Sequence, residues 1–246
     1  MSALIRPIAI KYFRNINKVD IKFDNSPVTI ADKLIEEKIR ELLNLEFPSH
    51  PIFGEEYGGS LDKKISWCID PIDGTRAFIA GKPIFGTLIA LCSNEKPIIG
   101  SIDMPCLDEL YIGFFDEVQN LSSAKMNGKF ISASKKSDLS DALIATSSPN
   151  AFSKEGLQKF RKISEKCKDT YYGGDCHNYA LLASGHIDIV MEHKLSSYDM
   201  MALVPILLAS GAMVTDWSGQ PIKTQNAGEI LAASTPELHA SALSLL

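Results

Sequence analysis

The chain has 246 residues, 45% of them hydrophobic and 22% charged, which is typical of a folded globular protein and excludes a disordered one. A formal net charge of −5 provides no basic field for nucleic acid or an anionic membrane, so neither is an expected partner. The five cysteines are odd in number and form no CxxC pair, which argues against a disulfide framework and predicts a reducing, cytoplasmic location.

Neither export nor membrane insertion is expected from the apolar segments. The first residues, MSALIRPIAIKYFR, do not resemble a secretory signal, because no apolar run there precedes a small-residue cleavage site. The longest apolar window, 200–214, is shorter than the ~20 residues that a membrane-spanning helix needs, and it contains a proline. We expect a buried helix followed by a strand in this window.

The first half of the chain predicts helices followed by an antiparallel sheet. A flexible loop is expected at 18–26, and an amphipathic helix from Thr29, which forms a capping-box pattern with Asp32. A short buried strand, 65–70, is expected to end at Pro71. Apolar runs separated by turn signals then predict strands at 84–92, 97–103 and 109–114, with one more hairpin at 125–130.

From about residue 140 the pattern changes to alternating strands and helices. We expect strands at 142–147, 187–192, 212–216 and 230–234, and helices at 154–167, at 178–183 and after Asp199. No internal repeat is visible. We therefore predict a single domain, 1–246, in which residues 1–140 contain the helices and the antiparallel sheet and residues 141–246 form an α/β half.

Acidic residues stand at the ends of several predicted elements: Asp32, Glu55, Glu56, Asp70, Asp73 and Asp199. Each acid taken alone is explained equally well as a helix cap or a surface residue. Carboxylates that converge on one point repel one another unless a cation neutralises them. Mg²⁺ prefers carboxylates, a backbone carbonyl and water, and commonly works with a phosphate substrate. Together the acids therefore predict a magnesium site.

The segment WCIDPIDGT indicates how such a site is built. The proline fixes the backbone, so Asp70, Asp73 and the carbonyl of Ile72 are suited to face the same ions. Gly74 and Thr75 then begin a helix whose free N–H groups are expected to point toward the phosphate.

The motifs GEEYGG, WCIDPIDGT and SYDMMALVPILLASGAMVTDWSG, in this order, closely resemble the inositol monophosphatase family of Mg²⁺-dependent, lithium-sensitive phosphomonoesterases, over about residues 25–234. The resemblance implies a layered αβαβα sandwich of the inositol monophosphatase and fructose-1,6-bisphosphatase type, and a homodimer. It also implies two or three Mg²⁺ ions, whose ligands would be Glu55, Asp70, the Ile72 carbonyl, Asp73 and Asp199.

The same resemblance implies the chemistry. Asp32 would hydrogen-bond Thr75 and reach a third, weaker metal, and Glu56 would support the orientation of water. A water activated by the metal and oriented by Glu55 and Thr75 would attack phosphorus in line, without a phosphoenzyme. No serine or cysteine motif for a covalent route is present.

Three local features favour one substrate within the family. Arg76 after the motif threonine, the segment YYGGDC and the replacement of Trp-Asp by Tyr-Asp at Asp199 resemble the histidinol-phosphate phosphatase branch more than the inositol branch. L-histidinol phosphate is therefore the first expected substrate, and myo-inositol 1-phosphate is the alternative. The expected substrate contacts are Asp73, Gly74, Thr75, Gly174, Asp175, Glu192 and Asp199.

Glu192 stands seven residues before Asp199, where inositol enzymes keep a glutamate that binds substrate hydroxyls. Here Glu192 and Asp175 are suited to pair with the ammonium or imidazole of an amino-alcohol phosphate. The alternative for Glu192 is a solvent-facing strand end. His177 and His193 flank these segments, but water activated by a metal needs no histidine base, so we expect neither in the chemistry.

Two further functions stay open. A nucleotide 3′-phosphatase is disfavoured because the chain lacks an obvious insertion to hold a base. A regulatory binding partner, as some bacterial members of the family are with the transcription machinery, is disfavoured by the intact ligand set, and the acidic balance argues against direct RNA contact.

Overall fold

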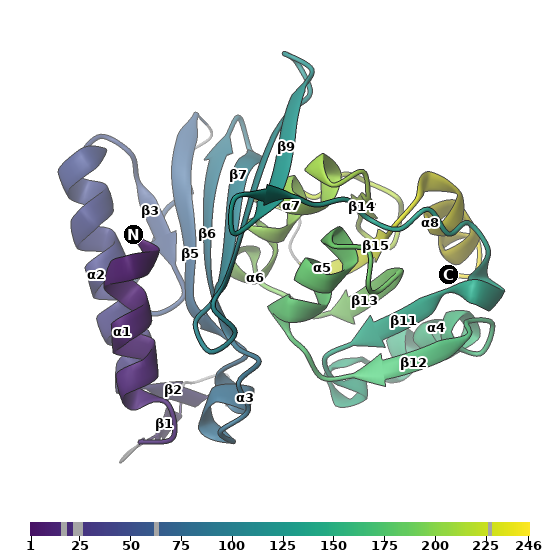
Figure 1. Cartoon of the computed structure of the whole chain (residues 1–246), viewed down its shortest axis with the longest axis horizontal. Helices are drawn as coiled ribbons and strands as arrows, with labels where there is room; N and C mark the ends of the chain where they lie inside the picture. Colours follow the sequence, from purple (N-terminus) through teal and green to yellow (C-terminus); the bar gives the residue numbers. More distant parts are fainter. Residues whose placement is uncertain (16–18, 22–26, 62–63, 226–227) are drawn as a thin grey trace.

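Two β-sheets separated by a layer of helices form the framework of the protein (Figure 1). The computed structural model describes residues 1–15, 19–21, 27–61, 64–225 and 228–246. Further helices cover the outer face of each sheet, so helices and sheets alternate across the molecule. The expected αβαβα sandwich is confirmed. The described residues form no helix that is long and apolar enough to span a bilayer.

The first sheet has eight strands in the order β10-β9-β8-β7-β6-β5-β3-β4, antiparallel except for the parallel pair β3 and β5. Its strands are β3 Ile52–Gly54, β4 Gly58–Gly59, β5 Ile65–Asp73, β6 Gly86–Ser93, β7 Lys96–Met104, β8 Glu109–Asp116, β9 Leu121–Met126 and β10 Lys129–Phe130. The predicted antiparallel strands and the hairpin at 125–130 are confirmed, whereas β3 and β4 were not predicted.

The prediction that Pro71 ends its strand is wrong. Strand β5 continues to Asp73, and its pairing with β6 shifts register between Asp70 and Asp73. A proline donates no backbone hydrogen bond, and a bulge is a place where a strand tolerates one. The Thr87 hydroxyl on β6 donates to the Pro71 carbonyl at 2.8 Å, which supports the irregular segment.

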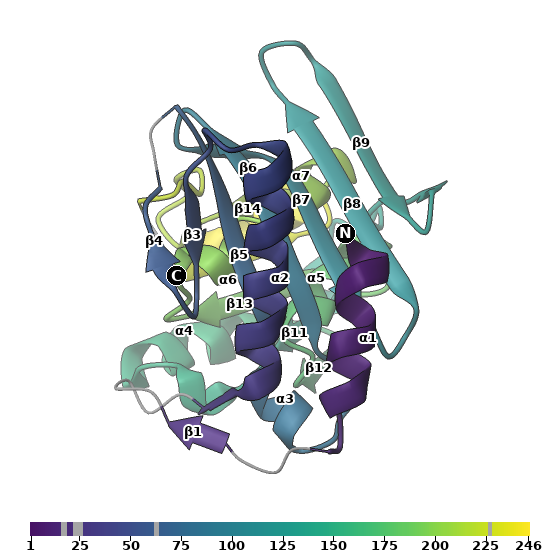
Figure 2. The same ribbon diagram turned by 90° about the vertical axis from the view of Figure 1, so that its left-hand side faces the viewer.

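Helices α1 (Ser2–Tyr12) and α2 (Ile30–Glu46) cover the outer face of the first sheet (Figure 2). The apolar stripe of α2, including the fully buried Ile35 and Ile39, packs against Ile69 of β5. As predicted, Thr29 caps α2 in a reciprocal capping box with Asp32. Of the loop expected at 18–26, residues 19–21 form strand β1 (Val19–Ile21), which pairs with β2 (Pro27–Thr29), and residues 18 and 22–26 lie outside the described part.

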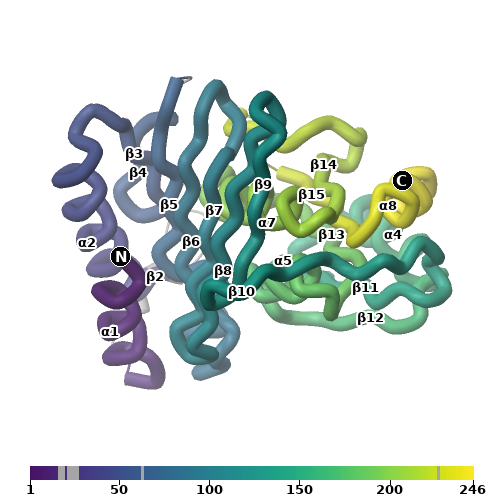
Figure 3. Tube along the Cα trace, turned by 45° about the horizontal axis from the view of Figure 1, so that its top comes forward, coloured from purple at the N-terminus to yellow at the C-terminus, as the bar shows by residue number. Residues whose placement is uncertain are grey.

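Helices α5 (Cys176–Ala183), α6 (Ser197–Met200) and α7 (Leu203–Ala209) lie between the sheets (Figure 1), and Figure 3 shows α5 and α7 there from another side. Helix α7 is almost wholly buried, and with β14 (Met213–Thr215) it confirms the predicted buried helix and strand. Two glycines of the first sheet let the helix region approach closely. A Cβ on Gly113 would lie 2.3 Å from the Ile206 Cα, and one on Gly100 would lie 1.9 Å from the Ala202 carbonyl oxygen.

The second sheet has five strands in the order β12-β11-β13-β15-β14, with parallel and antiparallel pairs. Its other strands are β11 Leu143–Thr146, β12 Asp169–Tyr172, β13 Ile189–His193 and β15 Glu229–Ala233. Helices α4 (Lys154–Ser164) and α8 (Pro236–Leu243) pack on its outer face. The strands and helices predicted from 142 onward are confirmed within a few residues. Strand β12 and helix α8 were not predicted.

Candidate metal centre and substrate cavity

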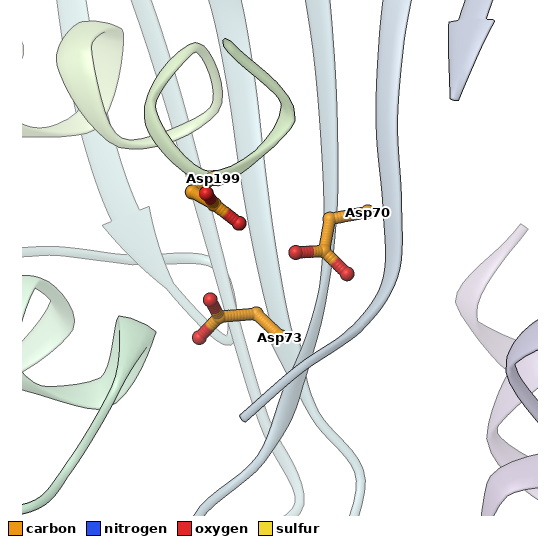
Figure 4. A group of neighbouring side chains, drawn as sticks. All are labelled: Asp70, Asp73 and Asp199. Atoms are coloured by element: carbon orange, nitrogen blue, oxygen red, sulfur yellow. The ribbon is translucent and has the colours of Figure 1, made fainter. Parts of the chain in front are cut away.

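Three aspartates from the two halves of the chain meet at one point. Asp70 and Asp73 lie on the irregular end of β5, and Asp199 lies in the first turn of α6 (Figure 4). One carboxylate oxygen from each lies within 4.8 Å of the other two. Ser196 fixes Asp199, because its backbone N–H donates to Asp199 Oδ2 at 2.6 Å.

This cluster has the electrostatics of a cation site. Burial raises the pKa of Asp70 well above its usual value, and repulsion by Glu55, Asp73 and Asp199 raises it further. Burial also raises the pKa of Asp73, with repulsion from Asp175 and Asp199. Asp70 Oδ1 is buried and has no hydrogen-bond partner among the described residues. An unpaired carboxylate oxygen inside an all-oxygen cluster fits a hard divalent cation.

Glu55 stands beside this cluster, and its backbone N–H donates to the Ile69 carbonyl of β5 at 3.1 Å. Glu56 follows it, half-buried, and its backbone N–H donates to Glu36 Oε2 at 2.7 Å. Glu36 lies on α2 and was not among the predicted residues. Its pairing with Arg40 at i+4 is a common surface pattern on a helix, and the loop amides that it also binds lie about twenty residues away in the sequence.

Asp32 and Thr75 meet at the other side of the cluster. The Thr75 hydroxyl lies 2.9 Å from the Ile72 carbonyl oxygen and 3.5 Å from Asp32 Oδ1. Asp32 Oδ2 accepts hydrogen bonds from both the backbone N–H and the hydroxyl of Thr29, at 2.8 and 2.6 Å. Burial raises the pKa of Asp32 to about 6, against the lowering effect of these hydrogen bonds.

Helix α5 begins at the cluster. The backbone N–H of Cys176 donates to Asp73 Oδ2 at 2.6 Å, and Asp175 before it has a left-handed φ of 46°. Burial raises the pKa of Asp175 to about 6. Gly74 has a φ of 83°, and a Cβ there would lie 2.9 Å from Asp175 Oδ2, so glycine allows this approach. Helix α3 (Thr75–Ile79) then starts as predicted.

A cavity of about 660 Å³ opens beside the aspartates, between α5 and the second sheet. Its walls include Asp73, Asp175, Glu192 and Asp199. Gly174 does not line the cavity. Glycine is required at this position because its φ is 117° and a Cβ there would lie only 2.1 Å from the Asn178 side chain.

The reading of Glu192 as a solvent-facing strand end is wrong. Glu192 lies near the end of β13 and is only 7% exposed. Its Oε1 accepts hydrogen bonds from the backbone N–H of Ser147, at 2.9 Å, and from the Ser147 hydroxyl. Burial raises the pKa of Glu192 to about 7.

Tyr179 lines the cavity and was not predicted from the sequence, because an aromatic residue on an apolar helix is expected in the hydrophobic core. Its hydroxyl is buried beside Glu192, and among the described residues no hydrogen bond of normal geometry satisfies it.

The two histidines near these segments, His177 and His193, differ in position. His193 lines the cavity and stacks on Trp217, whereas His177 lies outside it, 3.5 Å from Glu109.

Comparisons with known proteins agree with this geometry. The model of the inositol monophosphatase family matches residues 4–246. The chain belongs to the inositol monophosphatase family. Members of this family are metal-dependent phosphatases, so the chain is a phosphatase, and Asp70, Asp73 and Asp199 form an acidic cluster that could hold a metal ion.

Three relatives show the range of names around this member of the inositol monophosphatase family. The chloroplastic bifunctional phosphatase IMPL2 of Arabidopsis thaliana is 42% identical, over 96% of this chain and 70% of that protein. A histidinol-phosphatase of Streptomyces coelicolor is 33% identical, over 83% of this chain and 79% of its own. A solved inositol monophosphatase from Zymomonas mobilis is 42% identical, with a TM-score of 0.89, over 99% of this chain and 93% of that chain.

Proposed function

We propose that the protein is a Mg²⁺-dependent phosphomonoesterase whose preferred substrate is L-histidinol phosphate. The observation that carries the substrate is the pair of carboxylates, Asp175 and Glu192, on the cavity wall. Burial raises the pKa of both, so a cationic ammonium or imidazolium would offset the cost of holding them ionised. The names of two relatives, a histidinol-phosphatase and a bifunctional phosphatase, support the same direction.

The residues proposed to hold Mg²⁺ are Glu55, Asp70, the Ile72 carbonyl, Asp73 and Asp199, with two or three ions in all. The unpaired Asp70 Oδ1 and the mutual repulsion of the aspartates support this donor set. When bound, Mg²⁺ lowers the pKa of water and neutralises charge on the phosphate.

The chain itself contributes orientation. Glu55 and Thr75 would orient the attacking water, and Asp32 would accept from Thr75 when the hydroxyl turns from the Ile72 carbonyl. Gly74 and Thr75 would contact the phosphate at the end of β5, and Glu56 would keep the loop of Glu55 in place. These roles agree with in-line attack in a preformed site.

Myo-inositol 1-phosphate is the second candidate. Carboxylates such as Asp175 and Glu192 also accept hydrogen bonds from sugar hydroxyls, and the solved relative from Zymomonas mobilis is an inositol monophosphatase. The homodimer, the lithium sensitivity, the cytoplasmic location and a regulatory role stay predictions.

Phosphate release from a panel of esters in Mg²⁺ tests the proposal. The panel contains L-histidinol phosphate, myo-inositol 1-phosphate and a nucleotide 3′-phosphate, and Asp70→Asn is the inactive control. We expect kcat/KM for L-histidinol phosphate to exceed the others at least about tenfold, as a site built around polar partners discriminates. If the protein releases phosphate from no ester while a relative assayed in parallel does, the proposed phosphatase activity is rejected. If it prefers the inositol ester, L-histidinol phosphate is rejected as the preferred substrate.

A matched pair of variants tests the carboxylates directly. Glu192→Gln removes the charge but keeps an acceptor for Ser147. Asp175→Asn removes the charge at the start of α5. If these carboxylates bind a cationic leaving group, both variants lose more kcat/KM on L-histidinol phosphate than on the inositol ester. Equal losses on the two esters would contradict the cationic contact.

A further inference from the structure

We propose that Glu36 and Arg40 are positioning residues that hold the loop of residues 54–59, and with it Glu55, in the geometry needed to bind metal. The inference rests on the proposed role of Glu55 as a Mg²⁺ ligand. Neither Glu36 nor Arg40 lines the cavity or belongs to the aspartate cluster. Both lie on α2, behind the loop.

Glu36 is a fully buried carboxylate whose hydrogen bonds go to this loop and to Arg40. Its Oε2 accepts the backbone N–H of Glu56 at 2.7 Å. Its Oε1 accepts the backbone N–H of Tyr57 at 3.3 Å and Arg40 Nε at 2.7 Å. A buried charge is tolerated when it is paired and hydrogen-bonded, and two of these three hydrogen bonds of Glu36 come from the loop.

Arg40 ties the other end of the same loop. While Nε binds Glu36, Nη2 donates to the Gly58 carbonyl, so one guanidinium joins the buried carboxylate to the loop backbone. Lysine cannot reproduce this fork, because its ammonium is a single point donor group on a flexible stem. Glu36 and Arg40 together therefore bind the backbone N–H groups of Glu56 and Tyr57 and the carbonyl of Gly58.

The start of the loop is shaped to fit this pair. A Cβ on Gly54 would lie 2.0 Å from Glu36 Oε1 and 2.9 Å from Arg40 Nη2, so only glycine leaves room for the ion pair. On the opposite side, the Glu55 backbone N–H donates to Ile69 of β5. Glu55 is thus fixed between α2 and β5.

Glu55 lies directly beside the aspartate cluster. Repulsion by Glu55 and a hydrogen bond between the two side chains both contribute to the raised pKa of Asp70. Held in place, Glu55 meets an arriving ion without first paying the cost of ordering the loop. Partners that orient metal ligands typically contribute about 10–100-fold in metal affinity or activity.

Glu36→Gln is the decisive variant. A glutamine keeps the shape but offers one acceptor oxygen and one donor NH₂, so at least one of the three N–H donors must face another donor. Glu41→Gln is the matched control, because Glu41 is an exposed glutamate of the same helix that pairs with Lys38. Arg40→Lys is the second variant, in case Glu36→Gln does not fold.

Two measurements on the full chain test the proposal. The first is the Mg²⁺ concentration for half-maximal rise in melting temperature. We expect it to increase about tenfold in Glu36→Gln and in Arg40→Lys, and to stay unchanged in Glu41→Gln. The second is hydrogen exchange of the Glu56 and Tyr57 amides in metal-free protein, which should become faster in Glu36→Gln but not in the control.

A double variant distinguishes positioning from a general structural role. If Glu36 acts through Glu55, adding Glu36→Gln to Glu55→Gln changes the Mg²⁺ response less than twofold, because coupled residues are not additive. Full additivity, or an unchanged Mg²⁺ response in Glu36→Gln with unchanged amide exchange, would overturn the proposal. If Glu55→Gln alone leaves the Mg²⁺ response unchanged, the ligand role of Glu55 fails instead, while the amide exchange still reports whether the pair holds the loop.

Discussion

The Tyr179 hydroxyl is a buried donor on the cavity wall that lacks a hydrogen bond of normal geometry within the described structure. A buried hydroxyl without a partner costs free energy, which a substrate group can recover on binding. Burial raises the pKa of Tyr179, so the phenol keeps its proton and can donate it. A substrate group in the cavity would therefore give this hydroxyl a hydrogen bond of normal geometry.

Tyr179→Phe should separate these two effects. We expect kcat/KM for the physiological ester to fall about tenfold, because one hydrogen bond to the substrate is lost, while the melting temperature of free protein stays equal or rises. Tyr111→Phe is the control, because the buried Tyr111 donates to Glu109 at 2.8 Å away from the cavity. That control should lose stability and keep activity. A Tyr179→Phe protein with full activity would show that the hydroxyl does not contact substrate.

Glu192 predicts a pH dependence of stability. Burial raises its pKa from 4.5 to about 7, so between these values the folded protein holds a proton that the unfolded chain has already released. The free energy of unfolding contributed by this group is therefore fully present below pH 4.5 and is lost as the pH rises through about 7. Glu192→Gln carries no such proton and keeps an acceptor for Ser147.

In metal-free protein, the melting temperature of Glu192→Gln minus that of wild type should thus be larger at pH 8 than at pH 5. We expect this change to be on the order of 5 °C. Thermal unfolding in a chelator at both pH values measures this. A difference of the opposite sign would mean that folding lowers the pKa of Glu192 instead of raising it.

Among the elements, the irregular end of β5 places Asp70 and Asp73 side by side. The shift of register between Asp70 and Asp73 turns both side chains toward α6, although residues three apart on a regular strand face opposite sides. The supporting contact comes from β6, where the buried Thr87 hydroxyl donates to Pro71.

Thr87→Val keeps the shape of the side chain and removes that hydrogen bond. We expect a loss of about 1–2 kcal/mol in the free energy of unfolding, hence a melting temperature lower by roughly 2–8 °C, and a higher Mg²⁺ requirement. Thr87→Ser retains the hydroxyl and should preserve the Mg²⁺ requirement. Should Thr87→Val need no more Mg²⁺ than wild type, the bulge does not depend on this contact.

Local patterns predicted most elements, because Thr29, Asp32 and the apolar periodicity of α2 act over a few residues. Strand β12 was missed because DTYY is a short edge strand with mostly exposed side chains and no apolar alternation. The continuation of β5 past Pro71 depends on a bulge paired with β6, which no local rule reveals. The motifs marked Asp70, Asp73 and Asp199, which the structure brings together, whereas Glu36 was missed because the loop amides that it binds lie about twenty residues away.

Across the whole molecule, the aspartate cluster joins the two halves of the chain. Asp70 and Asp73 belong to the first sheet. Asp199 comes from α6, which follows strands β11, β12 and β13 in the chain and packs against β5 and β6. Without a cation, repulsion among these carboxylates opposes the packing of α6 on β5. With a cation, the same residues attract one ion and stabilise the contact between the halves.

Mg²⁺ should therefore stabilise the entire fold and not only the site. At a concentration about 100 times its dissociation constant, a ligand that binds only the folded state adds about 2.7 kcal/mol, which corresponds to a rise of roughly 5–10 °C in melting temperature for a chain of this size. Thermal unfolding of wild type in Mg²⁺ and in chelator measures the rise, and NaCl at equal ionic strength controls for screening.

Asp199→Asn is the informative partner in this experiment. It removes one repelled carboxylate, so metal-free Asp199→Asn should melt at or above the temperature of metal-free wild type, while its rise in Mg²⁺ should fall to less than half. These opposite signs follow only if Asp199 shares a cation with Asp70 and Asp73. An equal Mg²⁺ rise in Asp199→Asn and wild type would contradict a shared ion, and a rise reproduced by NaCl would reduce the effect to screening of surface charge.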